Sequence, residues 1–157
     1  MNGGLDGKVV IVTGAGAGIG LGILRSAIEA GADVTGFDID RNAEVKIVEA
    51  GARFFPVDVG DVCAFQAAID EVRATEGRLD GLVNNAGLTL TAPFLEADPA
   101  MWEWPWRVNQ RAVLVGAQAA ARFMAADGPA DRSSTSPPTT RAPATQPMPE
   151  TRVRSSP

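Results

Sequence analysis

Short apolar runs rich in β-branched residues alternate with helical patterns along the first 126 residues, and this alternation restricts the possible folds most strongly. The predicted strands cover 8–14, 33–38, 53–59 and 79–87, and the predicted helices between them cover 18–30, 42–50 and 61–76. Predicted core-facing positions are Ile19, Ile23, Ala27 and Ala30 in the first helix and Phe65, Ala68, Ile69 and Val72 in the third. Strands that are apolar on both faces are typical of a parallel sheet that is covered on both sides. We therefore expect an α/β fold with about four parallel strands and helices on both faces.

Prolines mark two irregular positions in this pattern. Pro56 lacks an amide hydrogen, so the third strand is predicted to be short or to lie at the edge of the sheet. Asp98 and Pro99 are typical of a helix start, and the last helix is predicted to run from there to about Ala126. Pro105 falls within this helix and predicts a kink or a late start.

The same helix carries three tryptophans and one asparagine. Trp102 and Trp106 share a helical face and are predicted to pack in the core, whereas Trp104 lies across the helix and is predicted at the surface. Asn109 stands in mid-helix, where asparagine competes with the helix for backbone groups. Either its side chain is exposed to solvent, or the backbone is distorted so that the side chain turns toward a site.

The composition changes abruptly at Asp127. The remaining residues hold seven of the 11 prolines, no aromatic residue and few apolar ones. Such a segment cannot bury enough apolar surface to offset its ordering entropy, so a disordered tail rich in Pro, Ser, Thr and Arg is expected over 127–157. The folded body is expected over 1–126, which is long enough for one hydrophobic core.

Charge and composition exclude several classes of function. The net charge is −5, and because the tail carries +1 the body carries −6, which argues against binding to nucleic acid. Cys63 is the only cysteine, so no internal disulfide forms and a reducing compartment is favoured. The absence of histidine excludes a histidine-based catalytic triad or zinc site, and no metal site is predicted. Because no apolar run could span a membrane and no signal peptide is recognisable, we expect a cytoplasmic protein.

A glycine-rich turn, "TGAGAGIG" at Thr13–Gly20, directly follows the first predicted strand and opens the first helix. Glycine lets the backbone approach a pyrophosphate closely, and the amino terminus of the helix offers N–H groups and a positive dipole end to it. The candidate binding residues are Gly14, Gly16, Gly18, Ile19 and Gly20. The alternative is a flexible turn without a ligand.

Asp38 ends the second predicted strand and is followed by Ile39. A carboxylate at this position can accept hydrogen bonds from both hydroxyls of an adenosine ribose and would repel a 2′-phosphate. The glycine turn carries no Lys or Arg to compensate, so the sequence favours NAD over NADP. The alternative is a solvated strand end.

Two further strand ends carry polar residues. Asp58 and Val59 follow the third predicted strand, where the carboxylate could meet the amino group of adenine. Asn85, Ala86 and Gly87 belong to "NNAG", which closes the fourth. Ligands bind at the carboxyl ends of parallel strands. The alternatives are a turn before the third helix for Asp58 and an ordinary turn for "NNAG".

These pieces, in this order, resemble the short-chain dehydrogenase/reductase family. The matching pieces are "TGAGAGIG", Asp38, "DV" at Asp58, "NNAG", and Trp102 seven residues before Asn109, and they extend over about 8–126. The resemblance implies a Rossmann-type sheet of about seven parallel strands, whose C-terminal half is missing from this chain. It also implies hydride transfer between NAD(P) and a small-molecule alcohol or carbonyl compound.

The resemblance also implies roles for individual residues. The glycine turn would hold the pyrophosphate, Asp38 the adenosine ribose, Asp58 and Val59 the adenine, and Asn85, Ala86 and Gly87 the ribose on the nicotinamide side. Asn109 would match the family's catalytic asparagine, which supports a water relay. In this family the last helix often contributes to a subunit interface, so self-association through it is expected.

The sequence departs from the family in its catalytic centre. Family members use a serine and a Tyr-x-x-x-Lys pair, in which the tyrosine is the general acid/base. This chain has no tyrosine, and its only lysines are Lys8 and Lys46, both early in the chain. We therefore expect no dehydrogenase turnover from the chain as printed. A non-catalytic NAD-binding module and an unstable fragment without function are the alternatives.

The tail can be read in a second way. Shifting the frame by one base lets the codons of residues 130–138 encode "GGSIVNISS", which resembles the family's next strand and its catalytic serine. We therefore hypothesise that a single-base insertion or deletion near Gly128 replaced the rest of a dehydrogenase by this tail. A natural disordered tail is the alternative.

Overall fold

The computed structural model describes residues 4–126, and the tail predicted over 127–157 lies outside the described residues. Four strands form one parallel sheet in the order β3-β2-β1-β4. Their bounds are Val9–Thr13 for β1, Asp33–Asp38 for β2, Arg53–Pro56 for β3 and Gly81–Val83 for β4. In the ladders, Ile11 pairs with Thr35 on one side and with Leu82 on the other. The predicted α/β fold with a parallel sheet is confirmed.

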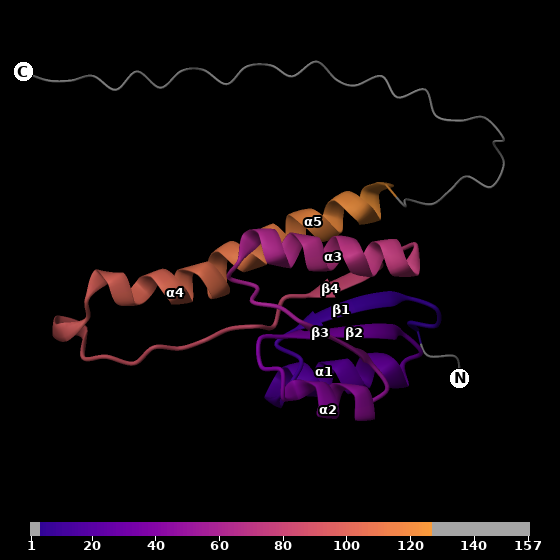
Figure 1. Ribbon diagram of the computed structural model, residues 1–157, viewed down its shortest axis with the longest axis horizontal. Helices are drawn as coiled ribbons and strands as arrows, with labels where there is room; N and C mark the ends of the chain where they lie inside the picture. The colour runs from indigo at the N-terminus through magenta and orange to yellow at the C-terminus, as the bar shows by residue number, and fades with distance from the viewer. Residues whose placement is uncertain (1–3, 127–157) are drawn as a thin grey trace, which may run out of the picture.

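Helices cover both faces of the sheet, as Figure 1 shows. α1 (Gly18–Glu29) and α2 (Ala43–Glu49) lie against one face, and α3 (Val62–Glu76) and α5 (Ala112–Ala126) lie together against the other. Parallel strands need such crossover connections. The carboxyl ends of all four strands therefore lie along one edge of the sheet, where the connections into the helices begin.

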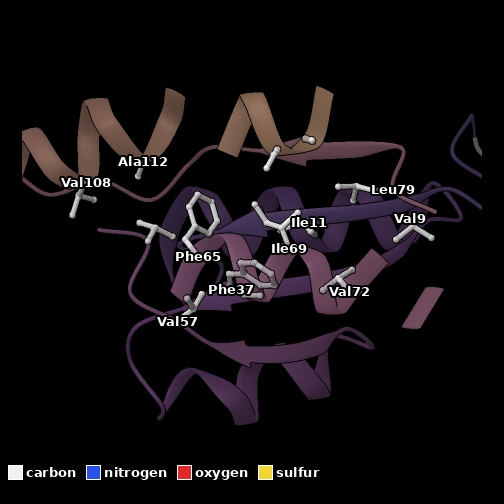
Figure 2. Packing of buried hydrophobic residues seen from close by; sticks show 14 residues of the cluster. Val9, Ile11, Phe37, Val57, Phe65, Ile69, Val72, Leu79, Val108 and Ala112 are labelled. Atoms are coloured by element: carbon white, nitrogen blue, oxygen red, sulfur yellow. The ribbon is translucent and has the colours of Figure 1, made fainter. Parts of the chain in front are cut away.

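Alternate residues of the buried strands face opposite sides, so the sheet separates two hydrophobic clusters. Ile11 of β1 faces α3 and α5, whereas its neighbour Val12 faces α1 and α2. Figure 2 shows the cluster on the α3 side, with Phe37, Phe65 and Ile69 in its middle. This alternation fixes which face of β1 each helix layer covers.

The core-facing side predicted for the third helix is confirmed, because Phe65, Ala68, Ile69 and Val72 are the buried residues of α3. The side predicted for the first helix is partly wrong. The buried residues of α1 are Gly20, Leu24 and Ala27, and Ile19 is 77% exposed. A Cβ atom at Gly20 would lie 2.0 Å from the carbonyl oxygen of Gly14, so the helix packs closely on the preceding turn at this point. That contact fixes the rotation of α1 and directs the positions one and two turns later toward the sheet.

Two strands are shorter than predicted. β3 ends at Pro56 rather than at residue 59, and it lies at the edge of the sheet, as the proline predicts. β4 covers Gly81–Val83 rather than 79–87. Its ladder stops because the amide hydrogens of Asn85 and Ala86 are taken by the Thr13 hydroxyl instead of by a backbone carbonyl of β1.

The last helix runs from Pro99 to Ala126 without a break, as predicted, but it is not a uniform α-helix. It opens with the 3₁₀ turn η2 (Pro99–Trp102), continues as α4 (Glu103–Trp106) and as the π-helical segment η3 (Arg107–Arg111), and ends as α5. A separate 3₁₀ turn, η1 (Phe94–Glu96), precedes it. Asp98 is an N-cap as predicted, but of η2, where its carboxylate accepts a hydrogen bond from the N–H of Ala100 at 2.8 Å. The helix is 3₁₀ before Glu103 and α-helical only from there, so the late start predicted from Pro105 is present.

The core position predicted for two tryptophans is also wrong. Trp102, Trp104 and Trp106 are 56%, 52% and 57% exposed. The helical spacing that relates Trp102 to Trp106 is real, but α4 extends past the sheet, and its main contacts are with η2 and η3 (Figure 1). No helix within residues 4–126 is long and apolar enough to cross a membrane.

Candidate functional site

A cavity of about 560 Å³ lies along the carboxyl ends of the strands. Eleven of the 13 residues that the sequence singled out line it: Gly14, Gly18, Ile19, Gly20, Asp38, Ile39, Asp58, Val59, Asn85, Ala86 and Gly87. Gly16 and Asn109 do not. The structure therefore brings together residues from the ends of all four strands. The volume of the cavity is that of a small-molecule or cofactor site.

The glycine turn between β1 and α1 is held by close backbone contacts. Gly14 has a φ of 63°, and a Cβ atom there would lie 2.9 Å from the Cα atom of Ala86. Gly20 packs on the carbonyl oxygen of Gly14, as described above. No side chain caps the amino terminus of α1, because its N-cap is Ala17. The first N–H groups of the helix are therefore open toward the cavity, which is the arrangement that binds a phosphate.

Asp38 connects this turn to the end of β2. Its Oδ2 atom accepts a hydrogen bond from the N–H of Gly16 at 2.8 Å, and its Oδ1 atom accepts one from the N–H of Asp40 at 3.0 Å. A Cβ atom at Gly16 would lie 2.4 Å from that of Ala43, so only glycine fits. Gly16 thus lies behind the cavity wall and positions the Asp38 carboxylate, which itself lines the cavity.

Thr13 and Asn85 fasten β1 to the segment after β4, and the sequence analysis assigned no role to Thr13. The buried Thr13 hydroxyl donates to the carbonyl of Val83 at 3.2 Å and accepts from the N–H groups of Asn85 and Ala86, both at 3.0 Å. The Asn85 amide donates to the carbonyls of Thr13 at 3.0 Å and Gly14 at 3.2 Å. Threonine is an ordinary strand residue, so no signal in the sequence distinguished it.

Asp58 belongs to a turn that two arginines hold from the other side. Its Oδ1 atom accepts a hydrogen bond from the N–H of Gly60 at 2.8 Å. The carbonyl of Gly60 accepts from Arg107 Nη2 at 3.1 Å and from Arg111 Nη2 at 2.8 Å. Neither arginine was predicted from the sequence, although their four-residue spacing places them on one helical face.

Asn109 lies in the π-helical segment η3. Of the two alternatives predicted for it, solvent exposure or a distorted backbone, the distorted backbone is present. Its Oδ1 atom accepts from the N–H of Leu88 at 2.9 Å, and its Nδ2 atom donates to the carbonyl of Leu88 at 2.8 Å. The side chain therefore holds the segment after β4, and Leu88 in turn lines the cavity.

The cavity is acidic, and Asn85 is its one other polar lining residue among the described residues. Asp38 and Asp58 are its only charged lining residues within the described part of the chain. Lining residues that the sequence analysis missed are Ala17, Phe37, Val57, Leu88, Trp104 and Val108. Residues 4–126 contain no group of three or more side chains that could hold a metal ion.

The model of the short chain dehydrogenase family matches residues 8–132, which is more than half of the chain. The chain belongs to this family. Short-chain dehydrogenases bind a nicotinamide cofactor. The C-terminal limit of the match lies six residues beyond the last described residue.

Several dehydrogenases of the family are similar to this chain. D-threitol dehydrogenase of Mycolicibacterium smegmatis is 36% identical over 126 residues, which are 76% of this chain and 48% of that protein. A short chain dehydrogenase of Mycobacterium smegmatis has 35% identity and a TM-score of 0.71 over 78% of this chain and 54% of its own. A short chain dehydrogenase of Burkholderia cenocepacia, solved in complex with NADP, has 34% identity and a TM-score of 0.71 over 76% and 51%. The chain spans about half the length of the relatives that it matches.

The described residues of this short-chain dehydrogenase fit the phosphate and adenosine parts of a dinucleotide. At Gly18, which lines the cavity, an added Cβ atom would meet nothing within 4 Å, so the backbone is open to a ligand. The uncapped start of α1 supplies N–H donors for phosphate oxygens, and the Asp38 carboxylate supplies an acceptor for hydroxyl groups.

Proposed function

We propose that this chain binds NAD through its glycine turn, Asp38 and the "NNAG" segment, as the cofactor-binding part of an oxidoreductase that acts on an alcohol or carbonyl compound. The observation that carries the proposal is that one cavity is lined by residues of the glycine turn and of the other strand ends, namely Gly14, Ala17–Gly20, Asp38, Asp58 and Asn85–Gly87. The bound nicotinamide would supply the hydride chemistry. The residues of this chain would bind and orient the cofactor and exclude water from its pyrophosphate.

The preference for NAD over NADP rests on charge. Asp38 presents a carboxylate at the cavity, and no Lys or Arg lines the cavity within residues 4–126. A 2′-phosphate placed beside that carboxylate would meet repulsion without a compensating cation, whereas two ribose hydroxyls would find an acceptor. The NADP bound to the Burkholderia relative belongs to a protein that is 34% identical in sequence to this chain.

Turnover needs an acid/base group that the printed residues do not supply. Both the oxygen and the nitrogen of the Asn109 side-chain amide form hydrogen bonds with the backbone of Leu88, which suits a role in positioning that segment. The printed sequence contains no tyrosine to protonate or deprotonate a substrate oxygen. We therefore propose that the chain binds NAD without oxidising an alcohol; formation of NADH from secondary alcohols by the purified chain would contradict this.

The experiment is a calorimetric titration of the full chain with NAD and NADP. NAD is expected to bind at least about tenfold more tightly than NADP, and Asp38→Asn is expected to reduce that ratio to about threefold or less. Asp33→Asn is the matched control, because Asp33 begins the strand that Asp38 ends and is exposed. Equal affinities for both cofactors in the unchanged chain would contradict the NAD preference, and no binding of either at millimolar concentration would contradict the proposed function.

For the tail over 127–157 we propose the frame change stated above. The abrupt change of composition at Asp127 and the end of the family match at residue 132 support it. Sequencing the gene across codons 120–157 and several hundred bases beyond tests it. A second frame that encodes "GGSIVNISS" followed by a Tyr-x-x-x-Lys segment is expected; closed frames would contradict it.

We also propose that the chain self-associates through α5. Leu114 is 60% exposed and Val113 38% exposed on this helix, which favours burial against a second copy. Light scattering is expected to show a dimer that Leu114→Lys converts to a monomer. A monomer in the unchanged chain would contradict the proposal.

A further inference from the structure

Three exposed apolar side chains border the cavity, and one of them comes from outside the strand ends. Ile19 is 77% exposed, Ile39 61% and Trp104 52%, and all three line the cavity. Ile19 belongs to the glycine turn, and Ile39 follows β2. Trp104 comes from α4, which contacts mainly η2 and η3. An indole that borders a cavity offers a flat apolar face to a flat ring.

The position of Trp104 along the cavity follows from how its helix is attached. Arg107 and Arg111 donate to the carbonyl of Gly60. A Cβ atom at Gly60 would lie 3.4 Å from Cγ2 of Val108, and Val108 belongs to the hydrophobic cluster of Figure 2. Trp104 precedes Val108 by one helical turn and shares its face. It therefore borders the cavity at the turn that follows β3.

The residues at this end of the cavity suit the binding of a nucleobase. β3 and β4 are the two edges of the sheet, so the turn after β3 lies across the sheet from Asn85–Gly87. Its walls include Ile39 and Val59, which are apolar, and the carboxylate of Asp58 is a hydrogen-bond acceptor. A flat heteroaromatic ring with an exocyclic amino group fits the apolar walls and the acceptor, because its ring can lie between the walls and its amino group can donate to the carboxylate.

We propose that Trp104 is a binding residue for the adenine of the cofactor: its indole stacks against the adenine ring and strengthens the binding of nucleotides that contain it. This inference rests on the proposed function. Arg107 and Arg111 are positioning residues, since they fix η3, and with it α4, to the turn that carries Asp58.

The neighbouring tryptophans are matched controls, because Trp102 and Trp106 are exposed to a similar extent but do not line the cavity. NAD, ADP-ribose and nicotinamide mononucleotide are titrated into the full chain and its variants. Trp104→Ala is expected to weaken the binding of NAD and of ADP-ribose about tenfold, which is the effect of losing one aromatic stacking contact with a base. Trp104→Phe, Trp102→Ala and Trp106→Ala are expected to change either affinity less than about threefold, and the mononucleotide is expected to bind Trp104→Ala unchanged.

The double variant Trp102→Phe/Trp106→Phe leaves Trp104 as the only tryptophan, so it keeps the test decisive if Trp104→Ala fails to fold. ADP-ribose is expected to change its fluorescence, and nicotinamide mononucleotide is not. Unchanged fluorescence with saturating ADP-ribose, or equal affinities in Trp104→Ala and the unchanged chain, would overturn the role of Trp104 while leaving NAD binding intact. Absence of NAD binding in the unchanged chain would overturn the proposed function itself.

Discussion

The connections after β1 and after β4 leave neighbouring strands and line the same cavity, but different groups hold them in place. The turn after β1 is held by backbone packed on backbone, with Gly20 against Gly14, and the side chains of Asp38 and Asn85 add hydrogen bonds to it. The segment after β4 is held by side chains, namely Thr13 and Asn85 at its start and Asn109 at Leu88. Beyond Leu88 the chain runs to exposed 3₁₀ turns.

The difference explains why one connection can be recognised in a sequence and the other only in part. Close backbone contacts require glycine at fixed spacing, and that requirement produces a motif. Hydrogen bonds from side chains about 20 to 70 residues away leave only scattered threonines and asparagines. The following predictions test the two kinds of attachment, in order of decreasing expected effect.

Gly20→Ala is expected to lower the free energy of unfolding by more than about 3 kcal/mol and to abolish NAD binding. The new Cβ atom would lie 2.0 Å from the Gly14 carbonyl oxygen, which belongs to the backbone and cannot rotate away. Gly22→Ala in the same helix is the control, since nothing lies within 4 Å of its Cβ position, and it is expected to raise stability by about 0.5–1 kcal/mol. Urea denaturation measures both; equal effects of the two substitutions would contradict a backbone-held turn.

Asn109→Ala is expected to lower the free energy of unfolding by about 2 kcal/mol, because two hydrogen bonds to Leu88 are lost. Hydrogen exchange is expected to accelerate over residues 86–102 and to stay unchanged over 14–20. Gln110→Ala, at the adjacent exposed position, is expected to change stability by less than about 0.5 kcal/mol. Faster exchange in the glycine turn as well would show that the two connections are not held independently.

Asp80→Asn tests the opposite end of the β1–β4 pair. The Asp80 carboxylate accepts hydrogen bonds from Arg78 Nε at 2.7 Å, the N–H of Val9 at 3.0 Å and Lys8 Nζ at 3.1 Å. The Arg78 hydrogen bond, assisted by those from Val9 and Lys8 and opposed by partial burial, holds the pKa of Asp80 well below its ordinary value of 3.8. A lowered pKa stabilises the fold above the unfolded-state value, and this contribution is lost as the pH falls through the folded-state value.

At pH 7 the substitution is therefore expected to cost about 1–2 kcal/mol, since Lys8 and Arg78 are about half exposed and solvent screens the pair. The difference from the unchanged chain is expected to shrink as the pH falls below 3.8. Asp70→Asn, at an exposed position of α3, is the control. Denaturation at a series of pH values measures the effect, and a cost that grows toward acid would contradict the assigned cause.

Thr35→Val is expected to raise the free energy of unfolding by about 1 kcal/mol. Thr35 is 2% exposed, and its hydroxyl has no hydrogen-bond partner within the described residues, in contrast to the Thr13 hydroxyl on β1. Thr35→Ser keeps the hydroxyl and loses the methyl group, so it is expected to lower stability by a similar amount. Thermal melting distinguishes the two, and a loss of stability in Thr35→Val would contradict the assignment.

Much of the fold could be predicted because the strands are strongly apolar and α3 has a clear helical period. The buried face of α1 could not be predicted, because the close contact of Gly20 rather than an apolar residue determines it. The positions of Trp102 and Trp106 could not, because helical spacing predicts which residues share a face but not whether that face meets a partner. In the site, the residues at the strand ends follow from the parallel topology. Thr13, which holds the segment after β4, and Trp104, which lines the cavity, act through tertiary contacts that leave no local pattern.

The most direct test of the account is a titration of the ¹⁵N-labelled chain with NAD, followed by amide chemical shifts. The account predicts shifts at Gly14–Gly20, Asp38–Ile39, Asp58–Val59 and Asn85–Gly87, with α2 and the far end of α3 unaffected. No shifts at millimolar NAD, or shifts concentrated away from the carboxyl ends of the strands, would contradict it.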